Sequence, residues 1–564
     1  MPYPRATTSA TQAAPCRRLT MTVAACLLAA AAGCTRGQYK EWADHQVYKI
    51  IDQKNQRALG KKPPFTIEPQ AQAALDRLAR KRQPLVVPEP DAPTPESLAP
   101  ELGVTRERPV MNLDQAVELA IWGSRDYQTH KENLYLAILA LTAEQHQWSA
   151  QLSGLIAGGW ERTDSERAWI ADSQFGVSQM LATGGALSLG LSGDFLRKID
   201  GDPKNSAASL FTASLVQPLW RGAGQEIAQE SLTQAERDAI YAVRDFAHYH
   251  RTFAVEVATG YYAVQQRRLV VGNEWANFVR RYRSLQRAEM MAKAGRMPQQ
   301  EVDQTRQDEL NASNRFISTL REYQNGLDSF KVQLGLPPLT DLDVDPDEMH
   351  ALLVTGTPPQ PLTLEQADHQ ALALRMDLIT SREQVEDAGR KVKVAANGLA
   401  PDLNLVGNLN AGNSAQNQPL TLGFGDRDKN VGLELGLPLD RFTERNTYRS
   451  ALIALERAKR DAAQLADNIR VQIARDWRAL EETRQSFDIQ RESAALARRR
   501  VEGVGILLAA GRAISRDLLE AQQALVDAEN ALSGAMVNYV TARLQLWRDM
   551  ETLQVGPTGA LTGQ

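Results

Sequence analysis

The feature that most constrains this chain is an internal repeat. The quartet Leu113-Asp-Gln-Ala116 recurs 251 residues later as Leu364-Glu-Gln-Ala367, and Ala294-Gly295-Arg296 recurs 216 residues later as Ala510-Gly511-Arg512. The signals follow the same order in both copies. They predict two copies of one unit, which runs as a starter helix, a glycine-rich β region, a long helix, a turn at Ala-Gly-Arg and a second long helix.

The β regions alternate with a period of two residues. Leu187, Leu189 and Leu191 are separated by small residues, and Val431 and Leu433 by a glycine. One strand face is therefore apolar and the other small or polar, as in strands that have lipid outside and water inside. The alternative is a soluble β-sandwich, but two small β regions separated by long helices make a poor sandwich.

The segments between the β regions are predicted to be long helices of coiled-coil type. No proline interrupts residues 224–292, which as a helix would extend roughly 100 Å. The last helix carries a seven-residue repeat of large residues, Leu518, Leu525, Leu532, Tyr539 and Leu546, and a parallel line of small ones, Ala521, Ala528, Ala535 and Ala542. A strict heptad with alanine on one line predicts left-handed supercoiling of closely approaching helices.

The amino-terminal residues indicate export. Arg17 and Arg18 precede an apolar run, residues 21–32, as in a cleavable signal peptide. The run leads through Gly33 to Cys34, and all three cysteines lie within the first 34 residues. Because Ala-Ala-Gly-Cys resembles a bacterial lipobox, we expect Cys34 to be acylated. The alternative is an ordinary signal peptide followed by an incidental cysteine. Residues 35–108 then form a proline-rich extended tether with a short amphipathic helix near Trp42–Gln56.

Composition excludes several functional classes. The net charge of -4 does not favour a nucleic-acid partner. The seven histidines are scattered, and we find no metal-binding helix motif, phosphate-binding loop or nucleophile elbow. We therefore predict no enzyme activity, no metal and no cofactor.

These signals together resemble the TolC family of outer-membrane efflux proteins. The resemblance rests on Leu113–Ala120 and Leu364–Ala367, on Gln217–Gly224 where a strand passes into a helix, and on Ala510–Ala521. It covers about residues 109–553.

The resemblance implies a mainly helical fold with transmembrane strands. Long antiparallel helical hairpins would form an α-barrel, joined to an outer-membrane β-barrel that three copies share. The expected partners of this homotrimer are a periplasmic adaptor (membrane fusion) protein, an inner-membrane transporter and outer-membrane lipid. The implied function is the channel of a tripartite efflux or type I secretion system. The chain would lie in the outer membrane and extend into the periplasm, with an amino-terminal lipid anchor.

The resemblance also implies roles for particular residues. Gly295-Arg296 and Gly511-Arg512 match the helical tips that meet the adaptor. Asp517 and Glu520 match positions where the family places carboxylates around a closing aperture, although a solvated helix face would also carry such residues. The tyrosine and arginine that lock the aperture in the family align with Leu508 and Ala513, so that lock is not expected here.

The first copy departs from the family in length. It has 31 more residues than the second between its starter quartet and the proline before its long helix. The extra stretch reads as two strands, about Phe175–Leu181 and Leu187–Phe195, around the hairpin signal Thr183-Gly184-Gly185. One hypothesis is six strands per protomer and an eighteen-stranded barrel instead of the family's four and twelve. The other is a hairpin folded outside the membrane.

The predicted division of the chain follows from these features. It comprises a signal peptide (1–33), a lipid-anchored proline-rich extension (34–108), a first repeat (109–340), a linker (341–360), a second repeat (361–553) and a tail (554–564). The alternative function is a periplasmic coiled-coil lipoprotein that scaffolds the envelope and conducts nothing. That reading explains the helices and Cys34 but not the two alternating β regions.

Overall fold

The computed structural model describes residues 35–60, 65–68, 81–86, 104–162, 167–198, 205–358, 362–413, 426–556 and 559–563. The chain divides into two units, Met1–Phe65 and Thr66–Gln564. The first unit contains helix α2, Arg36–Leu59, which ends at Gly60 in a left-handed conformation with φ 66°. The helix expected near Trp42–Gln56 lies within α2.

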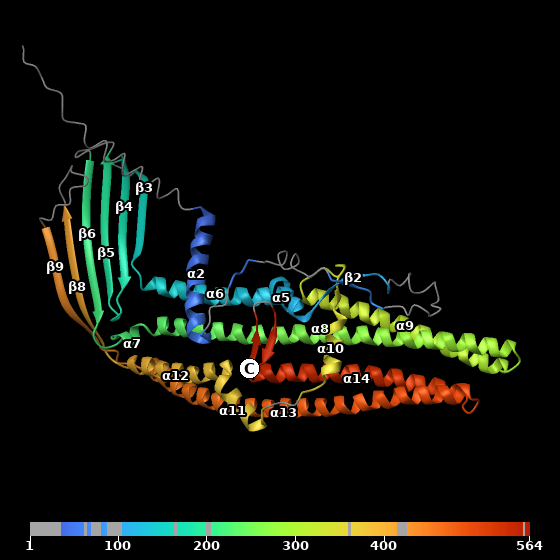
Figure 1. Ribbon diagram of the computed structural model, residues 1–564. Helices are drawn as coiled ribbons and strands as arrows, with labels where there is room; N and C mark the ends of the chain where they lie inside the picture. The colour runs from blue at the N-terminus through green and yellow to red at the C-terminus, as the bar shows by residue number, and fades with distance from the viewer. Residues whose placement is uncertain are drawn as a thin grey trace, which may run out of the picture. The chain divides into compact units, whose positions relative to one another are not determined.

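The second unit follows the predicted order of the repeats (Figure 1). The first repeat comprises α5 (Leu113–Gly123), α6 (Arg125–Gln147), β3 (Gln151–Arg162), β4 (Arg167–Met180), β5 (Ala186–Lys198), β6 (Asn205–Pro218), α7 (Gln225–Ala228), α8 (Glu230–Lys293) and α9 (Gln299–Gln333). The second comprises α11 (Leu364–Leu374), α12 (Met376–Asn397), β8 (Asp402–Asn413), β9 (Asp426–Gly436), α13 (Phe442–Ala509) and α14 (Ser515–Asp549).

The starter helices begin with the same reciprocal cap. The backbone N–H of Gln115 donates to Asn112 Oδ1 at 2.9 Å, and the Gln115 side chain accepts from Asn112 N at 3.1 Å. In the second repeat Gln366 and Thr363 exchange the equivalent bonds at 3.3 and 2.9 Å. A cap of this kind satisfies two backbone donors that a helix start otherwise leaves without partners.

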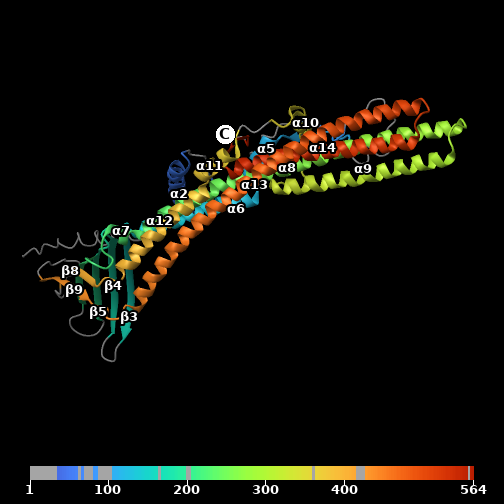
Figure 2. The same ribbon diagram turned by 90° about the horizontal axis from the view of Figure 1, so that it is seen from below.

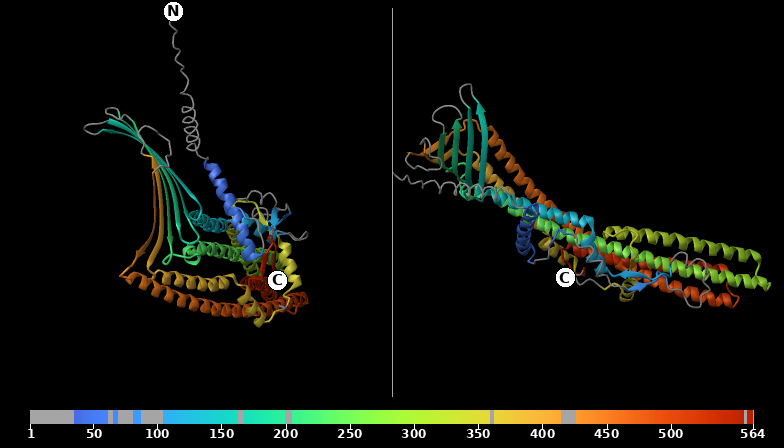
Figure 3. Two further views of the ribbon diagram at one scale, coloured as in Figure 1. Left: turned by 90° about the vertical axis from the view of Figure 1, so that its left-hand side faces the viewer. Right: turned by 90° about the horizontal axis from the view of Figure 1, so that it is seen from above.

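One antiparallel sheet receives strands from both repeats, in the order β3-β4-β5-β6-β8-β9. The first repeat supplies four strands and the second supplies two. The expected extra strands are the hairpin of β4 and β5, whose turn lies at Leu181–Gly185 and contains Gly184 with φ 89°. The sheet lies at one end of the second unit, and the α8–α9 and α13–α14 turns lie at the other (Figures 2 and 3).

The long helices pair as two antiparallel hairpins, α8 with α9 and α13 with α14. The alanine line of the α14 heptad is buried, as are the large residues Leu525, Tyr539 and Leu546. The predicted close packing of these helices is therefore present. Within the described residues, no helix has both the length and the apolar character to cross a membrane.

A group of short strands and one short helix, which we call the equatorial core, lies against the middle of the long helices. It contains β1 (Arg82–Gln83), β2 (Arg108–Met111), β7 (Asp343–Val344), α10 (Pro346–Thr355), β10 (Leu553–Val555) and β11 (Leu561–Gly563). Strand β7 pairs in parallel with β2, and Glu348 of α10 accepts hydrogen bonds from Leu113 N, Tyr261 Oη and Tyr262 Oη. Residues 341–360, expected to be a linker, and the expected tail after residue 553 thus carry structured elements of this core.

Candidate functional site

The sheet has two chemically different faces, because the paired strands keep their alternation in register. Phe175 of β4 lies opposite Leu191 of β5, which lies opposite Phe211 of β6. We call this side the apolar face. Its apolar members include Leu152, Ile156, Trp160, Trp169, Val177, Leu187, Leu189, Leu215, Leu405, Leu409, Val431, Leu433 and Leu435. Many of these large side chains are exposed, with Leu152 at 83% and Val431 at 78%.

The opposite side, the polar face, carries mostly small and hydrophilic residues, with some apolar ones among them: Leu155, Ile170, Leu210, Val216 and Val406. Uncharged members include Ser153, Gln174, Ser178, Ser188, Ser192, Thr212, Asn404, Asn408, Asn410 and Asn430. Charged members among the side chains described are Glu161, Asp172, Asp194, Asp402, Asp428 and Glu434, with no lysine or arginine. The Asp402 carboxylate is paired with Arg221 at 3.6 Å. This face therefore presents water-compatible, acidic chemistry.

Tryptophan side chains lie at both ends of the sheet. Trp160 and Trp169 lie opposite each other near the β3–β4 connection, far from the helices, and both are about half exposed. Trp220, also half exposed, follows β6 at the helix end of the sheet. Amphipathic rings at both limits of an apolar band are typical of strands that sit between two membrane interfaces.

The two predicted tips have the same backbone geometry. Gly295 has φ 68° and Gly511 has φ 70°, and each follows directly on the end of a long helix. Arg296 N donates to Met291 O at 2.9 Å, and Arg512 N donates to Leu507 O at 2.8 Å. Such bonds close a helix through a left-handed residue, a conformation that glycine adopts without strain.

The tips also expose apolar side chains. At the end of α8, Met290 is 64% exposed, and at the end of α13, Ile506 is 72% exposed. Ile514, which precedes α14, is 56% exposed. Apolar groups gathered at exposed helix ends are costly in water and indicate a contact surface.

The expected aperture residues lie close to the α13–α14 tip. Asp517 is in the first turn of α14, where its carboxylate accepts a hydrogen bond from Ile514 N at 3.3 Å. Glu520 lies one turn later and is exposed, with Arg516 at 3.8 Å. The structure thus brings both carboxylates to the tip and gives Asp517 a capping role that the sequence reading did not include. Cys34, the expected acylation site, lies outside the described residues.

A buried pair of carboxylates joins α13 to α14, away from the tips. Burial and a hydrogen bond with Asp549 raise the pKa of Asp476 to about 7. Burial acts against ionisation of Asp549 too, but hydrogen bonds from Arg548 and Asp476 outweigh it and lower the Asp549 pKa. Arg548 Nε and Nη2 contact the two Asp549 oxygens at 2.8 and 2.9 Å. Asp476 is therefore the member of the pair that holds the proton.

The histidines on α8 point to different neighbours. His248 Nδ1 lies 2.7 Å from Glu551 Oε1, whereas His250 Nδ1 lies 2.7 Å from Tyr127 Oη. Burial lowers the pKa of His250 to about 4, so its ring is neutral. Over the described residues, no group of three or more His, Cys, Asp or Glu side chains has the arrangement of a metal site.

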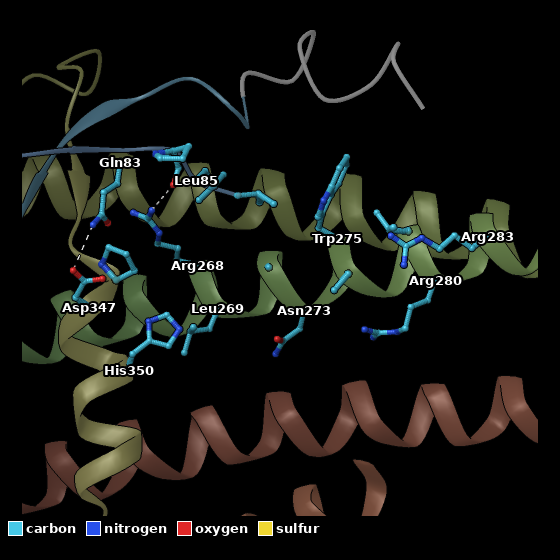
Figure 4. Close-up of a pocket in the computed structure, with 16 residues that line it drawn as sticks. Gln83, Leu85, Arg268, Leu269, Asn273, Trp275, Arg280, Arg283, Asp347 and His350 are labelled. Atoms are coloured by element: carbon cyan, nitrogen blue, oxygen red, sulfur yellow. Dashed lines mark hydrogen bonds between the residues drawn. The ribbon is translucent and has the colours of Figure 1, made fainter. Parts of the chain in front are cut away.

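One groove near the equator is bordered by residues of the extension. It has a volume of about 720 Å³ and lies between α8, α10 and residues 83–86 (Figure 4). Arg268 donates to Pro84 O at 2.8 Å and to Val344 O at 2.6 Å, and Gln83 donates to Asp347 at 3.5 Å. The described residues that line it include no serine, threonine, cysteine or tyrosine.

The second repeat matches the model of a known protein family. Residues 368–548 match the model of the outer membrane efflux protein family. The matched residues extend from α11 to the end of α14 and cover about a third of the chain. The resemblance to the TolC family seen in the sequence is thereby confirmed. None of the curated proteins matches the chain in sequence.

Solved outer-membrane channels have the same fold as this chain. VceC from Vibrio cholerae is 14% identical with a TM-score of 0.57, over 78% of this chain and 95% of that one. The CmeC channel of Campylobacter jejuni is 13% identical with a TM-score of 0.55, over 78% and 85%. The MtrE channel of Neisseria gonorrhoeae is 11% identical with a TM-score of 0.55, over 78% and 88%. The predicted fold of long helical hairpins joined to a strand region is confirmed.

Proposed function

We propose that this chain is the outer-membrane channel subunit of a tripartite efflux or type I secretion system, and that it is a conduit and not an enzyme. The observation that carries the proposal is the two-faced sheet joined at one end to two long helical hairpins. A sheet with an exposed apolar face is stable in lipid, whereas in water the same face would promote aggregation.

The strands have the length that a bilayer requires. The six strands contain between 11 and 14 residues. At about 3.3 Å per residue and a tilt of about 40°, a strand of 12 residues rises about 30 Å, which is the thickness of the hydrocarbon core. The tryptophans at the two ends of the sheet would then lie at the interfaces.

A homotrimer gives this sheet and these helices a closed form. An open sheet in lipid would leave the backbone groups of β3 and β9 without partners, at a cost of several kcal/mol for each group. Three copies would join their sheets into one barrel and their helices into one α-barrel. The match of residues 368–548 to the family model and the shared fold support this assembly.

The tips supply the surface for a periplasmic adaptor, which would link the channel to an inner-membrane transporter. Both tips present apolar side chains beside a glycine turn and an arginine, Arg296 or Arg512. The paired geometry supports a repeated contact, with two equivalent tips per protomer and six per trimer.

Asp517 and Glu520 would form the aperture of the closed channel. In a trimer, three copies of each residue would place carboxylates around one opening next to the tips. Carboxylate rings at a constriction favour cations and oppose free passage. Acylation of Cys34 would anchor the amino terminus to the membrane.

Planar bilayers test the proposal directly. Purified full-length protein should form a heat-labile trimer and give discrete single-channel conductance, which should rise when Asp517 and Glu520 are both changed to alanine. A trimer that stays electrically silent both with and without these substitutions would favour the alternative, a scaffold lipoprotein that does not conduct.

A further inference from the structure

The sheet of one protomer contains six strands, and this number has a consequence for the assembled channel. We propose that three copies close into one barrel of eighteen strands, in which β3 of each copy pairs with β9 of the next. The inference rests on the proposed function, since it takes the trimeric outer-membrane channel as given and specifies how its wall is built.

The additional hairpin is part of the wall and not an appendage. Strand β4 is paired with β3 from Arg167 to Ser178, and β5 is paired with β6 from Ala186 to Arg197. Strands β4 and β5 are also paired with each other along their length. Both strands therefore have partners on both edges, which is the position of interior strands. Removing them would remove three ladders and leave β3 without a neighbour.

The hairpin turn is fastened to the strand-to-helix passage. Thr183 Oγ1 donates to Gln217 Oε1 at 2.8 Å, and Gln217 Nε2 donates to Thr183 O at 3.2 Å. Gly224 N donates to Thr183 O at 3.2 Å. At Gly184, a Cβ would stand only 2.4 Å from Gly222 O. The turn is thus held by direct contact at the level where the helices begin.

The second repeat provides an internal comparison. At the position equivalent to Gln217 it has Leu437, before Pro438, and its described residues contain no hairpin equivalent to β4 and β5. The side-chain amide of Gln217, which holds the hairpin turn, is therefore present in the first repeat and replaced by Leu437 in the second.

The two free edges suit each other as partners. Every neighbouring pair in the sheet is antiparallel, so the six strands alternate in direction, and β3 runs opposite to β9. Pairing β9 with β3 of the next copy therefore continues the antiparallel pattern around a ring. The two edge strands contain 12 and 11 residues, which allows a ladder of full length.

The faces also continue across this junction. On the apolar face, β3 contributes Leu152 and Ile156, and β9 contributes Val431 and Leu433. On the polar face β9 contributes Asp428, Asn430, Gly432 and Glu434, and β3 contributes Ser153, Ala157 and Glu161 together with Leu155. A ring of eighteen strands belongs to the size class that encloses a water-filled channel, whereas narrower barrels fill with side chains.

Disulfide trapping tests the junction. Ala157→Cys on the polar face of β3 is combined in turn with Asn430→Cys, Gly432→Cys or Glu434→Cys on the polar face of β9. Oxidation of membranes should link subunits into covalent trimers for at least one pair. The control is Ala157→Cys with Val431→Cys, whose side chains point to opposite faces and should not link. Absence of linkage in all three polar-face pairs would overturn the inference.

Thiol labelling tests whether the hairpin lies in the wall. A water-soluble, membrane-impermeant maleimide should modify Gln174→Cys, which faces the lumen, but not the adjacent Phe175→Cys, which faces lipid. Leu189→Cys on β5 repeats the lipid-facing test and guards against misfolding of one variant. Equal labelling of positions 174, 175 and 189 would place the hairpin in water and overturn the inference.

The outcomes that contradict the eighteen-stranded barrel differ from those that contradict the proposed channel function. A conducting trimer with no linkage between β3 and β9, or with an evenly labelled hairpin, contradicts only the eighteen-stranded wall. A protein that forms no trimer and no conductance contradicts the proposed function itself.

Discussion

The glutamines in the two starter quartets have a local structural role. Gln115 and Gln366 each return a side-chain hydrogen bond to the residue before their helix, Asn112 or Thr363. Replacing one partner of such a cap costs about 1 kcal/mol. The motif that suggested the family is thus partly a helix-start signal, and its recurrence at the same point of both repeats makes it informative.

Substitutions can remove the charge of Asp517 and Glu520 and still retain the helix-capping hydrogen bond of residue 517. Asp517→Asn retains an oxygen that accepts from Ile514 N, and Glu520→Gln retains the side-chain shape. If the carboxylates restrict the aperture, the double variant should raise single-channel conductance several-fold in planar bilayers. Glu502→Ala, an exposed acidic position on α13, is the control and should leave conductance unchanged. A double variant with the conductance of the parent would remove these residues from the aperture.

Asp476 predicts a specific dependence of stability on pH. Because its pKa is about 7 in the folded protein and near 4 when unfolded, the native state binds the proton more tightly. Stability from this site is greatest below pH 4 and is lost as pH rises through 7, by roughly 4 kcal/mol at most. Asp476→Asn should remove this dependence, so the variant should melt higher than the parent at pH 8. Parallel melting curves from pH 5 to 8 for both proteins would show that the site does not titrate in this range.

At the scale of elements, the β4–β5 turn should depend on its glycine. Gly184 and Gly222 both have left-handed backbones, with φ 89° and 79°. A Cβ at Gly184 would collide with Gly222 O, whereas a Cβ at Gly222 meets no atom within 4 Å. Gly222→Ala should therefore cost only the conformational strain, about 1 kcal/mol, and Gly184→Ala about 2 kcal/mol or more. The midpoints of thermal unfolding of the two variants measure this difference. Equal losses of stability in both variants would mean that the turn is not tightly packed.

The sequence predicted the large elements well because their signals are long and periodic. The alanine line of α14 and the alternation in Val431–Leu435 each extend over several repeats of one period, and each dictates a single buried or exposed face. The additional hairpin was also visible, since Gly184-Gly185 interrupts two alternating runs.

Other features were not predictable, because they depend on contacts between distant segments. The parallel pairing of β7 with β2 joins residues that are more than 200 positions apart. The proton held between Asp476 and Asp549 requires two helices to bury both carboxylates together. The sequence around Asp517 did not show whether this residue caps a helix or lines an aperture. In the structure its carboxylate caps α14, which is compatible with the proposed place at the aperture.

At the scale of the whole molecule, the polar face predicts the ion selectivity of the assembled channel. Among its described side chains the charged members are all acidic, and Asp172 lies directly opposite Asp194. Three copies should make the lumen attractive to cations. Reversal potentials under a KCl gradient should show cation preference, which Asp172→Asn with Asp194→Asn should reduce about twofold. The effect should be larger at low salt, because charges are screened less. Ser178→Ala on the same face is the control, and an anion-selective parent would contradict the prediction.

The central claim is that the two-faced sheet lies in a membrane while the helices project from it. Electron cryomicroscopy of the purified full-length protein in lipid nanodiscs measures this directly. The account predicts three copies around one axis, with the six-stranded sheet β3-β4-β5-β6-β8-β9 inside the lipid disc and the tips at Gly295 and Gly511 far from it on one side. Particles in which the sheet lies outside the disc, or in which single copies bind lipid without closing a wall, would contradict it.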